Sequence, residues 1–335
     1  MPGIPGIPGT SRSRWVALVT VLALVLAVAG SAVFFRLARA GEPAGRAASP
    51  PATPRPPTTP ATPIGATGTP HSPSAHQKTP RPRAARPALG QLAERQVMIM
   101  DDITAAFEHG HAVPQYADIE NLHDGCGYTA GWIGFCTATG DMLDLVKRYN
   151  AVRPGNALAK YTERLRRLAD AESDRVDTLG TGFTTDWRHA AADPAFRRAQ
   201  LDIGHDLYLL PAIAAAKREG ITTMLGVEHL FDTALQSGPS AHDCAGMPQT
   251  VSRTNRIMGG NPAHGVSERR WLLAYDQIRT RQLQRPCEPG REVDWPDSVD
   301  RVAALSGLIR AGNWRLDLPV RLGSDVQITI RLPAH

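Results

Sequence analysis

A Pro-, Ala- and Thr-rich stretch at residues 41–88 confines the folded part of this 335-residue chain to residues 89–335. The stretch contains few large apolar side chains, so it cannot bury a core, and we expect an extended, disordered linker. Residues 89–335 contain the helical hydrophobic patterns and all four cysteines. The length of this segment suits one large domain, and we expect a single α-rich domain there.

The first 40 residues predict export. Trp15–Phe35 is an uncharged apolar run, preceded by Arg12 and Arg14 and followed by Ala38-Arg39-Ala40. Its length would span a bilayer as a helix, and it also fits the core of a secretory signal. The positive flank favours export in either case. We expect a signal peptide at residues 1–40, with an uncleaved membrane anchor as the alternative, and a secreted or extracellular domain.

The net charge of +5 conceals an acidic folded part. Ten of the 37 Lys and Arg residues lie in residues 1–88, but only one of the 32 Asp and Glu residues does. Residues 89–335 therefore hold 27 basic and 31 acidic residues, a net charge of −4. This balance argues against nucleic acid as a partner and suits a cationic ligand.

The cysteines predict disulfides. Cys126, Cys136, Cys244 and Cys287 are an even number, and in an exported chain two disulfides are the default. Three pairings are possible, of which Cys126–Cys136 with Cys244–Cys287 is the simplest. A zinc site is the alternative, but no Cys-x-x-Cys pair is present.

Apolar residues at three- and four-residue steps predict a mainly helical domain. The first amphipathic helix contains Leu89, Leu92, Ile99, Ile103 and Phe107 and ends near Gly110. Further helices are expected from Asp141, after Gly155, from Asp193-Pro194 to Gly220 with a break near Pro211, and at 222–238, 267–284 and 297–311. The Gly-spaced residues 124–138 predict a turn and strand, and the alternating residues 314–332 predict a small hairpin.

Two acidic residues, Glu108 and Asp124, are candidates for catalysis. Cleavage of a glycosidic bond needs one protonated carboxyl group and one ionised carboxylate. Glu108 ends an apolar helix face, where burial favours the protonated form, and Asp124 opens a glycine turn whose amides favour the ionised form. The spacing alone is weak evidence, because Asp-Gly pairs usually form turns.

The stretch "YADIENLHDGCGYTAGWIGFCTATGDMLDLVKRYNAVRPGNALAKY" at residues 116–161 resembles the signature region of the family 46 chitosanases. The resemblance continues in order at 183–220, 231–239 and 310–318. It implies a mainly α (α+β), lysozyme-like, two-lobed helical fold with one small β-sheet and a cleft between the lobes. It also implies endo-acting, inverting hydrolysis of the β-1,4 linkages between glucosamine units of chitosan.

The same resemblance implies the catalytic roles. Glu108, in "AFEHG", takes the place of the general acid, and Asp124, in "HDGCGYT", takes the place of the general base. Thr129 matches the threonine that helps to hold the attacking water, and a hydroxyl group can donate or accept for this purpose. An inverting enzyme needs its two carboxyl groups roughly 6.5–9.5 Å apart to admit that water.

Four further residues match the family pattern. Asp141 matches an acid that binds sugar amines on the non-reducing side of the cut. Asp232, Arg279 and Arg301 would form a buried charge network behind the general acid. The chain departs from the family at Cys126, where many members have an arginine that helps to bind sugar; we expect that contact to be lost and the turn to be linked to Cys136 instead.

The resemblance implies no metal and no organic cofactor, and chitosan is the expected partner of a monomeric enzyme. Two other functions are compatible with the sequence. The first is a peptidoglycan muramidase or lytic transglycosylase on the same scaffold, which an acidic domain disfavours because peptidoglycan is anionic. The second is a surface-tethered polysaccharide-binding protein that has lost activity.

Overall fold

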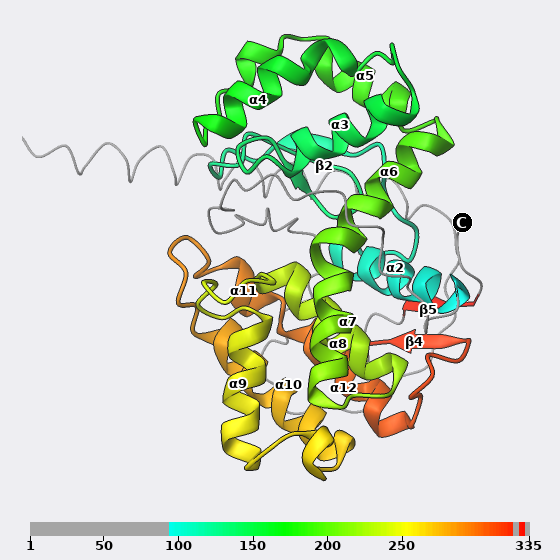
Figure 1. Ribbon diagram of the computed structural model, residues 1–335, viewed down its shortest axis with the longest axis vertical. Coiled ribbons are helices and arrows are strands. Elements are labelled where there is room, and N and C mark those ends of the chain that lie inside the picture. The colour runs from blue at the N-terminus through cyan, green and yellow to red at the C-terminus, as the bar shows by residue number, and fades with distance from the viewer. Residues whose placement is uncertain (1–93, 324–327, 332–335) are drawn as a thin grey trace, which may run out of the picture. The chain divides into compact units, whose positions relative to one another are not determined.

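The computed structural model of the protein describes residues 94–323 and 328–331. The predicted signal or anchor at Trp15–Phe35, the linker at 41–88, and Leu89 and Leu92 lie outside the described residues. The described part is mainly helical, as predicted, and its helices gather in two lobes (Figure 1). No helix in this part of the chain is long and apolar enough to cross a membrane.

The first lobe, residues 119–204, combines a small sheet with short helices. Its elements are β1 (Ile119–Asn121), β2 (Tyr128–Ala130), β3 (Phe135–Cys136), α3 (Asp141–Val152), η1 (Ala159–Tyr161), α4 (Thr162–Asp170), η2 (Val176–Leu179), α5 (Phe183–Ala190) and α6 (Pro194–Gly204). The sheet is antiparallel in the order β1-β2-β3. Thr129 lies in the central strand, opposite Glu120 on one side and Cys136 on the other.

The second lobe, residues 94–109, 210–323 and 328–331, is built around a buried helix. Its elements are α2 (Glu94–His109), α7 (Leu210–Glu219), α8 (Met224–Ser237), α9 (Met247–Met258), η4 (Pro262–His264), α10 (Glu268–Gln284), α11 (Asp294–Asp297), α12 (Val299–Ala311), β4 (Val320–Leu322) and β5 (Ile328–Ile330). Every residue of α8 after Met224 is buried, because α2, α7, α10 and α12 pack around it. The antiparallel pair β4–β5 is the predicted hairpin and is separate from the first sheet.

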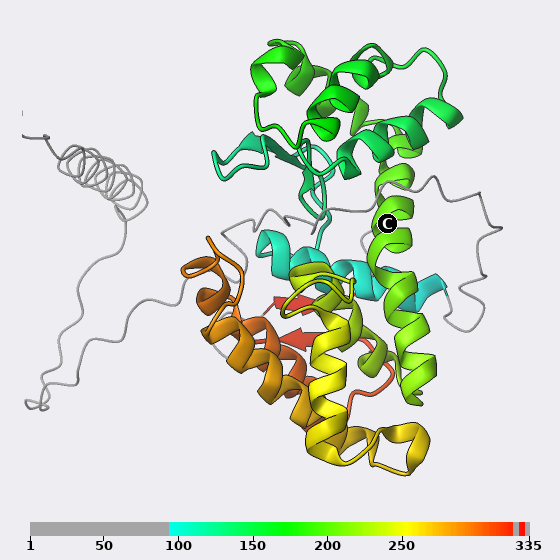
Figure 2. The same cartoon turned by 60° about the vertical axis from the view of Figure 1, so that its left-hand side comes forward.

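A continuous helical segment connects the lobes (Figures 1 and 2). It begins with Asp193, whose side chain caps the helix by accepting from the N–H of Ala195, and Pro194 occupies the first turn. The sequence predicts a break near Pro211. Instead, the helix passes through a π turn, η3 (His205–Leu209), and continues into α7. The wider π turn accommodates the irregularity that a helical proline introduces, so the helix is not interrupted.

Aromatic side chains form much of the core of the first lobe. Trp187 is fully buried and meets Phe196 edge-on, with ring centroids 5.0 Å apart. Phe183 makes a similar contact with Tyr161 at 4.9 Å. Such edge-to-face pairs contribute beyond their burial, and they fix α5 and α6 against the rest of the lobe.

Two disulfides connect loops to the lobes. The structure pairs Cys126 with Cys136 and Cys244 with Cys287, which is the simplest of the three pairings considered from the sequence. The first disulfide is buried and joins the Gly-spaced turn to β3. The second lies at the surface and joins the α8–α9 connection to the α10–α11 connection.

Candidate active site

Glu108 lies in the last turn of α2 with its side chain buried. Nη2 of Arg301, on α12, donates to Oε1 of Glu108 at 3.0 Å. The guanidinium of Arg301 also lies over the ring of Phe107, 5.1 Å from its centroid. Among the described residues no hydrogen-bond partner is found for Oε2 of Glu108, so one oxygen of this carboxyl group is held and the other is left for a ligand.

A buried charge network continues behind Glu108. Nε and Nη2 of Arg301 both donate to Oδ1 of Asp232, on α8, at 3.1 and 2.5 Å. Arg279, on α10, forms an ion pair of 2.5 Å with Oδ2 of the same carboxylate, and its Nη2 donates to Gln236. Burial raises the pKa of Asp232, but the two arginines outweigh it and bring the pKa below its usual value. The structure therefore brings Asp232, Arg279 and Arg301 together with Glu108.

Asp124 lies in the exposed turn between β1 and β2. Its Oδ1 accepts from the backbone N–H of Cys126 at 3.0 Å. Gly125 and Gly127 both have positive φ, at 92° and 78°, and a Cβ on Gly127 would lie 2.3 Å from Oγ1 of Thr137. Together with the disulfide at Cys126, these contacts fix the turn that carries the Asp124 carboxylate.

Thr129 lies two residues beyond Gly127, on β2. Its side chain is buried, and its hydroxyl oxygen has no hydrogen-bond partner in the described part of the chain. A buried hydroxyl without a partner is uncommon and calls for an explanation, such as an ordered water or a ligand group. The position suits the role that the sequence predicts for it.

Asp141 is the first residue of α3 and is buried. Its Oδ1 accepts three hydrogen bonds, from the N–H groups of Cys136 and Met142 at 2.9 and 2.7 Å and from the hydroxyl of Thr139 at 2.8 Å. Burial raises the pKa of Asp141 to about 6 in spite of these bonds. Oδ1 is thus fully used, and Oδ2 is the oxygen that could bind an amine.

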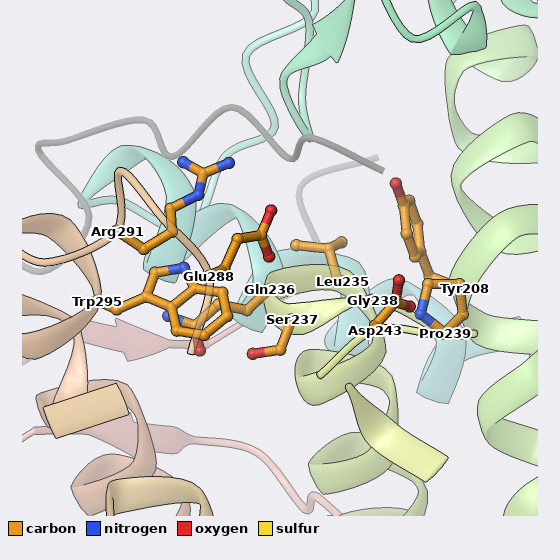
Figure 3. A pocket seen from close by; sticks show the side chains of 10 residues that line it. All are labelled: Tyr208, Leu235, Gln236, Ser237, Gly238, Pro239, Asp243, Glu288, Arg291 and Trp295. Atoms are coloured by element: carbon orange, nitrogen blue, oxygen red, sulfur yellow. The ribbon is translucent and has the colours of Figure 1, made fainter. Parts of the chain in front are cut away.

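A pocket next to the charge network was not predicted from the sequence (Figure 3). It is lined by Tyr208, Leu235, Gln236, Ser237, Gly238, Pro239, Asp243, Glu288, Arg291 and Trp295. Gln236 connects it to the network, because its side chain accepts from Arg279 and donates to Ser298. Burial raises the pKa of Tyr208, and Asp141, Asp243 and Glu108 raise it further. Acids from both lobes therefore influence the hydroxyl group of Tyr208, which lies on the π turn.

One feature of the sequence points toward this pocket. Asp243 directly precedes Cys244, and Glu288 directly follows Cys287. The pairing of these cysteines brings the two acids to the same pocket, but neither acid belongs to a periodic pattern that would single it out.

The lysozyme-like helical fold, with carboxyl groups in both lobes and a buried arginine network behind one of them, is that of a glycoside hydrolase. Comparison with known proteins specifies the family. Residues 102–320 match the model for glycosyl hydrolase family 46, and the chain belongs to that family.

The relatives are chitosanases. The chain is 36% identical over 225 residues to a chitosanase of Bacillus subtilis (strain 168), covering 67% of this chain and 80% of that protein. It is 35% identical over 209 residues to a chitosanase of Streptomyces sp. (strain N174), covering 62% and 70%. A family 46 chitosanase of Gynuella sunshinyii, solved in complex with chitotetraose, is 35% identical, with a TM-score of 0.67 over 72% of this chain and all of that one. The resemblance seen in the sequence is confirmed.

Proposed function

We propose that the protein hydrolyses β-1,4 linkages between glucosamine units within chitosan chains, with inversion at the anomeric carbon. The family and its chitosanase members support this substrate. The observation that carries the mechanism is the contact between Arg301 and Glu108, because it fixes a buried carboxyl group with one oxygen occupied.

Glu108 acts as the general acid in this mechanism. Arg301 occupies Oε1, so the proton is carried by Oε2 and passes from there to the leaving glycosidic oxygen. The negative charge that forms on Glu108 as the proton leaves faces the Arg301 guanidinium. An arginine already held in place by Asp232 stabilises that charge without having to reorganise.

Asp124 acts as the general base and removes a proton from the attacking water. The hydrogen bond from the N–H of Cys126 holds one of its carboxylate oxygens in place, and its exposed position admits solvent. The hydroxyl of Thr129, five residues later, has no partner among the described residues and orients the water toward the anomeric carbon. Inversion requires acid and base on opposite sides of the sugar ring, with this water between base and sugar.

Asp141 binds the amine of a glucosamine unit on the non-reducing side of the cut. A glucosamine unit is cationic when its amine is protonated, and an ammonium group provides donors for Oδ2, the oxygen that the three described hydrogen bonds leave unused. Burial disfavours the ionised form of Asp141. An ion pair with the protonated amine stabilises that form and offsets the effect of burial.

The test is hydrolysis of highly deacetylated chitosan by the wild type and by Glu108→Gln and Asp124→Asn, with Asp177→Asn as a control. Asp177 is a solvent-exposed acid of the first lobe. Each of the first two variants should lose at least about 100-fold in kcat, and the control should keep wild-type activity. Proton NMR of the first products should show the α-anomer. Near-wild-type turnover by Glu108→Gln or Asp124→Asn, or release of the β-anomer, would refute the mechanism.

A further inference from the structure

His109, the last residue of α2, connects the helix of the candidate general acid to the first lobe. Its Nε2 lies 2.9 Å from the carbonyl oxygen of Trp132, in the turn between β2 and β3. A carbonyl oxygen can only accept, so Nε2 carries a hydrogen and donates it. On the other side of the ring, Nδ1 lies 3.8 Å from Oδ2 of Asp118. The N–H of Gly131 donates to the carbonyl of Asp118 at 2.8 Å, so both contacts of the imidazole fall at one end of the β1–β2 pair.

This hydrogen bond joins the two segments that carry the proposed chemistry. His109 directly follows Glu108, the proposed general acid. Trp132 lies three residues beyond Thr129, which the mechanism assigns to the attacking water. Helix α2 lies on the side of the second lobe that faces the first lobe (Figures 1 and 2). The His109 side chain is only 14% exposed, so water competes little for the bond.

A second histidine also fixes Trp132. The indole of Trp132 is fully buried and meets the ring of His205 edge-on, with the ring centroids 6.1 Å apart. Nε2 of His205 lies 2.7 Å from Oδ1 of Asp101, which precedes Glu108 by about two turns of α2. Helix α2 therefore holds Trp132 at two points, at its carbonyl through His109 and at its ring through His205.

The relative position of the two lobes matters for the proposed reaction. Inversion needs the acid and the attacking water on opposite sides of one sugar ring in the same transition state. The acid belongs to the second lobe and the water-binding threonine to the first, so the arrangement of the lobes sets their separation. A displacement of about 1 Å can cost about 100-fold in rate. A contact that fixes α2 against the β2–β3 turn therefore acts on the chemical step without touching a reacting atom.

We propose that His109 is a positioning residue: its hydrogen bond to the carbonyl of Trp132 holds the general acid and the attacking water at their working separation. The proposal rests on the proposed function, because it needs both an acid at Glu108 and a water at Thr129. In this role His109 contacts neither the sugar nor the water. Loss of the bond therefore lowers kcat, while KM, which depends on many contacts along the sugar chain, stays near its wild-type value.

The experiment compares His109→Leu and His109→Gln with the wild type on highly deacetylated chitosan. Leucine fills the site without a donor, so kcat should fall about 10- to 100-fold, with KM within about threefold of the wild type. Glutamine places an amide N–H about as far from the backbone as Nε2 of histidine, and it can donate to the same carbonyl. His109→Gln should therefore recover kcat to within about fivefold of the wild type.

His111→Leu is the matched control. His111 is an exposed histidine two residues further along the chain, so this variant loses the same kind of side chain and keeps the contact with Trp132. It should have the wild-type kcat and KM. Wild-type kcat in His109→Leu, or equal losses in His109→Leu and His109→Gln, would overturn the positioning role and leave the hydrolase intact. A rise in KM at unchanged kcat would overturn it as well.

Hydrogen exchange tests the contact without relying on hydrolysis. In His109→Leu, the backbone amides of residues 128–136 should exchange at least about twofold faster than in the wild type, because the turn loses its connection to α2. His109→Gln should restore the wild-type rate. Unchanged exchange in His109→Leu would overturn the proposal. If the wild type cleaves no chitosan, the proposed function fails, and the exchange rates alone decide whether His109 fixes the turn.

The same measurement shows whether each variant is folded. The amides of the buried helix α8 are the internal reference, because α8 lies in the core of the second lobe. If His109→Leu loses the protection of α8, His109→Phe takes its place, since phenylalanine keeps an aromatic ring and lacks the donor. The same losses in kcat and in protection of residues 128–136 are expected of it.

Discussion

Nη2 of Arg301 lies 3.0 Å from Oε1 of Glu108, although the two residues are 193 positions apart in the sequence. The same nitrogen lies 2.5 Å from Oδ1 of Asp232. One guanidinium thus couples the candidate general acid to a buried anion on α8. Asp232 also pairs with Arg279, so the network contains two buried cations and one buried anion. The remaining positive charge would stabilise the carboxylate that forms if Glu108 gives up a proton.

Replacing Asp232 by Asn should destabilise the fold. The variant leaves Arg279 and Arg301 buried without their anion, and breaking a buried pair in this way costs about 3–5 kcal/mol. Urea denaturation should show this loss in the free energy of unfolding. Asp144→Asn is the control, because it breaks an exposed pair with Lys147 and should cost less than about 1 kcal/mol. Equal stability of Asp232→Asn and the wild type would contradict the network.

Replacing Thr129 by Val should separate activity from stability. Val keeps the β-branched shape that suits the central strand and removes a hydroxyl for which the described residues offer no partner. We expect an unchanged or slightly higher free energy of unfolding, since no hydrogen bond is lost, and a fall in kcat of about 10- to 100-fold from the loss of water orientation. Thr129→Ser should retain most of the activity. Full activity in Thr129→Val would exclude the proposed role.

Replacing Asp141 by Asn should change the pH dependence of stability. The folded protein holds the Asp141 proton to about pH 6, whereas the ordinary carboxyl pKa is 3.8. Ionising Asp141 between about pH 4 and pH 6 therefore lowers the stability of the folded state. The variant avoids this loss and its carbonyl can accept the same hydrogen bonds. It should exceed the wild type by about 2–3 kcal/mol at pH 7.5 and match it near pH 4, as measured by urea denaturation.

The same substitution should weaken substrate binding. In the wild type, KM for chitosan oligomers should rise as the pH falls through about 6, because protonated Asp141 no longer attracts the amine. In Asp141→Asn, KM should already be high at pH 7.5 and should lack this component of the pH profile. A pH-independent stability difference, together with a wild-type KM profile, would show that Asp141 neither titrates nor binds as proposed.

Two glycines of the Asp124 turn should differ in their tolerance of alanine. Both have positive φ, but a Cβ at Gly125 meets nothing within 4 Å, while a Cβ at Gly127 meets Thr137 and Val176 at 2.3 and 2.8 Å. Gly125→Ala should cost about 1–2 kcal/mol of stability from backbone strain alone. Gly127→Ala should cost more and also lower kcat, because the turn between Asp124 and Thr129 must shift. Denaturation and turnover of the two variants, compared side by side, check this.

The helices that the sequence predicts correctly are those with a clear apolar period. The stop of α2, the start of α3 at Asp141 and the cap at Asp193 all follow local rules. The helix α9 was missed, because its inner face is made partly by Thr250 and Thr254, whose hydroxyls donate to carbonyls four residues back. The short α5 and the strand β1 were missed as well, and all three depend on tertiary packing more than on pattern.

Only part of the candidate site could be predicted from the residue types and their spacing. The two candidate carboxyl groups follow from the chemistry of glycosidic bonds, but the partners of Glu108 came from the family resemblance, since no local pattern connects positions 108, 232, 279 and 301. The pocket formed by Asp243 and Glu288 was not predicted, because acids in loops show no periodicity and their proximity depends on which cysteines pair.

The π turn at His205–Leu209 gives the connection between the lobes a natural hinge. A helix bends most easily where its regular hydrogen bonding is disturbed, and here Pro211 lies two residues beyond the end of the π turn. Bending at this point would change the orientation of the first lobe, which carries Asp141, relative to the second, which carries Asp243. In the proposed chitosanase, such bending would change the spacing of the acids carried by the two lobes, and Tyr208 lies within the turn that would bend.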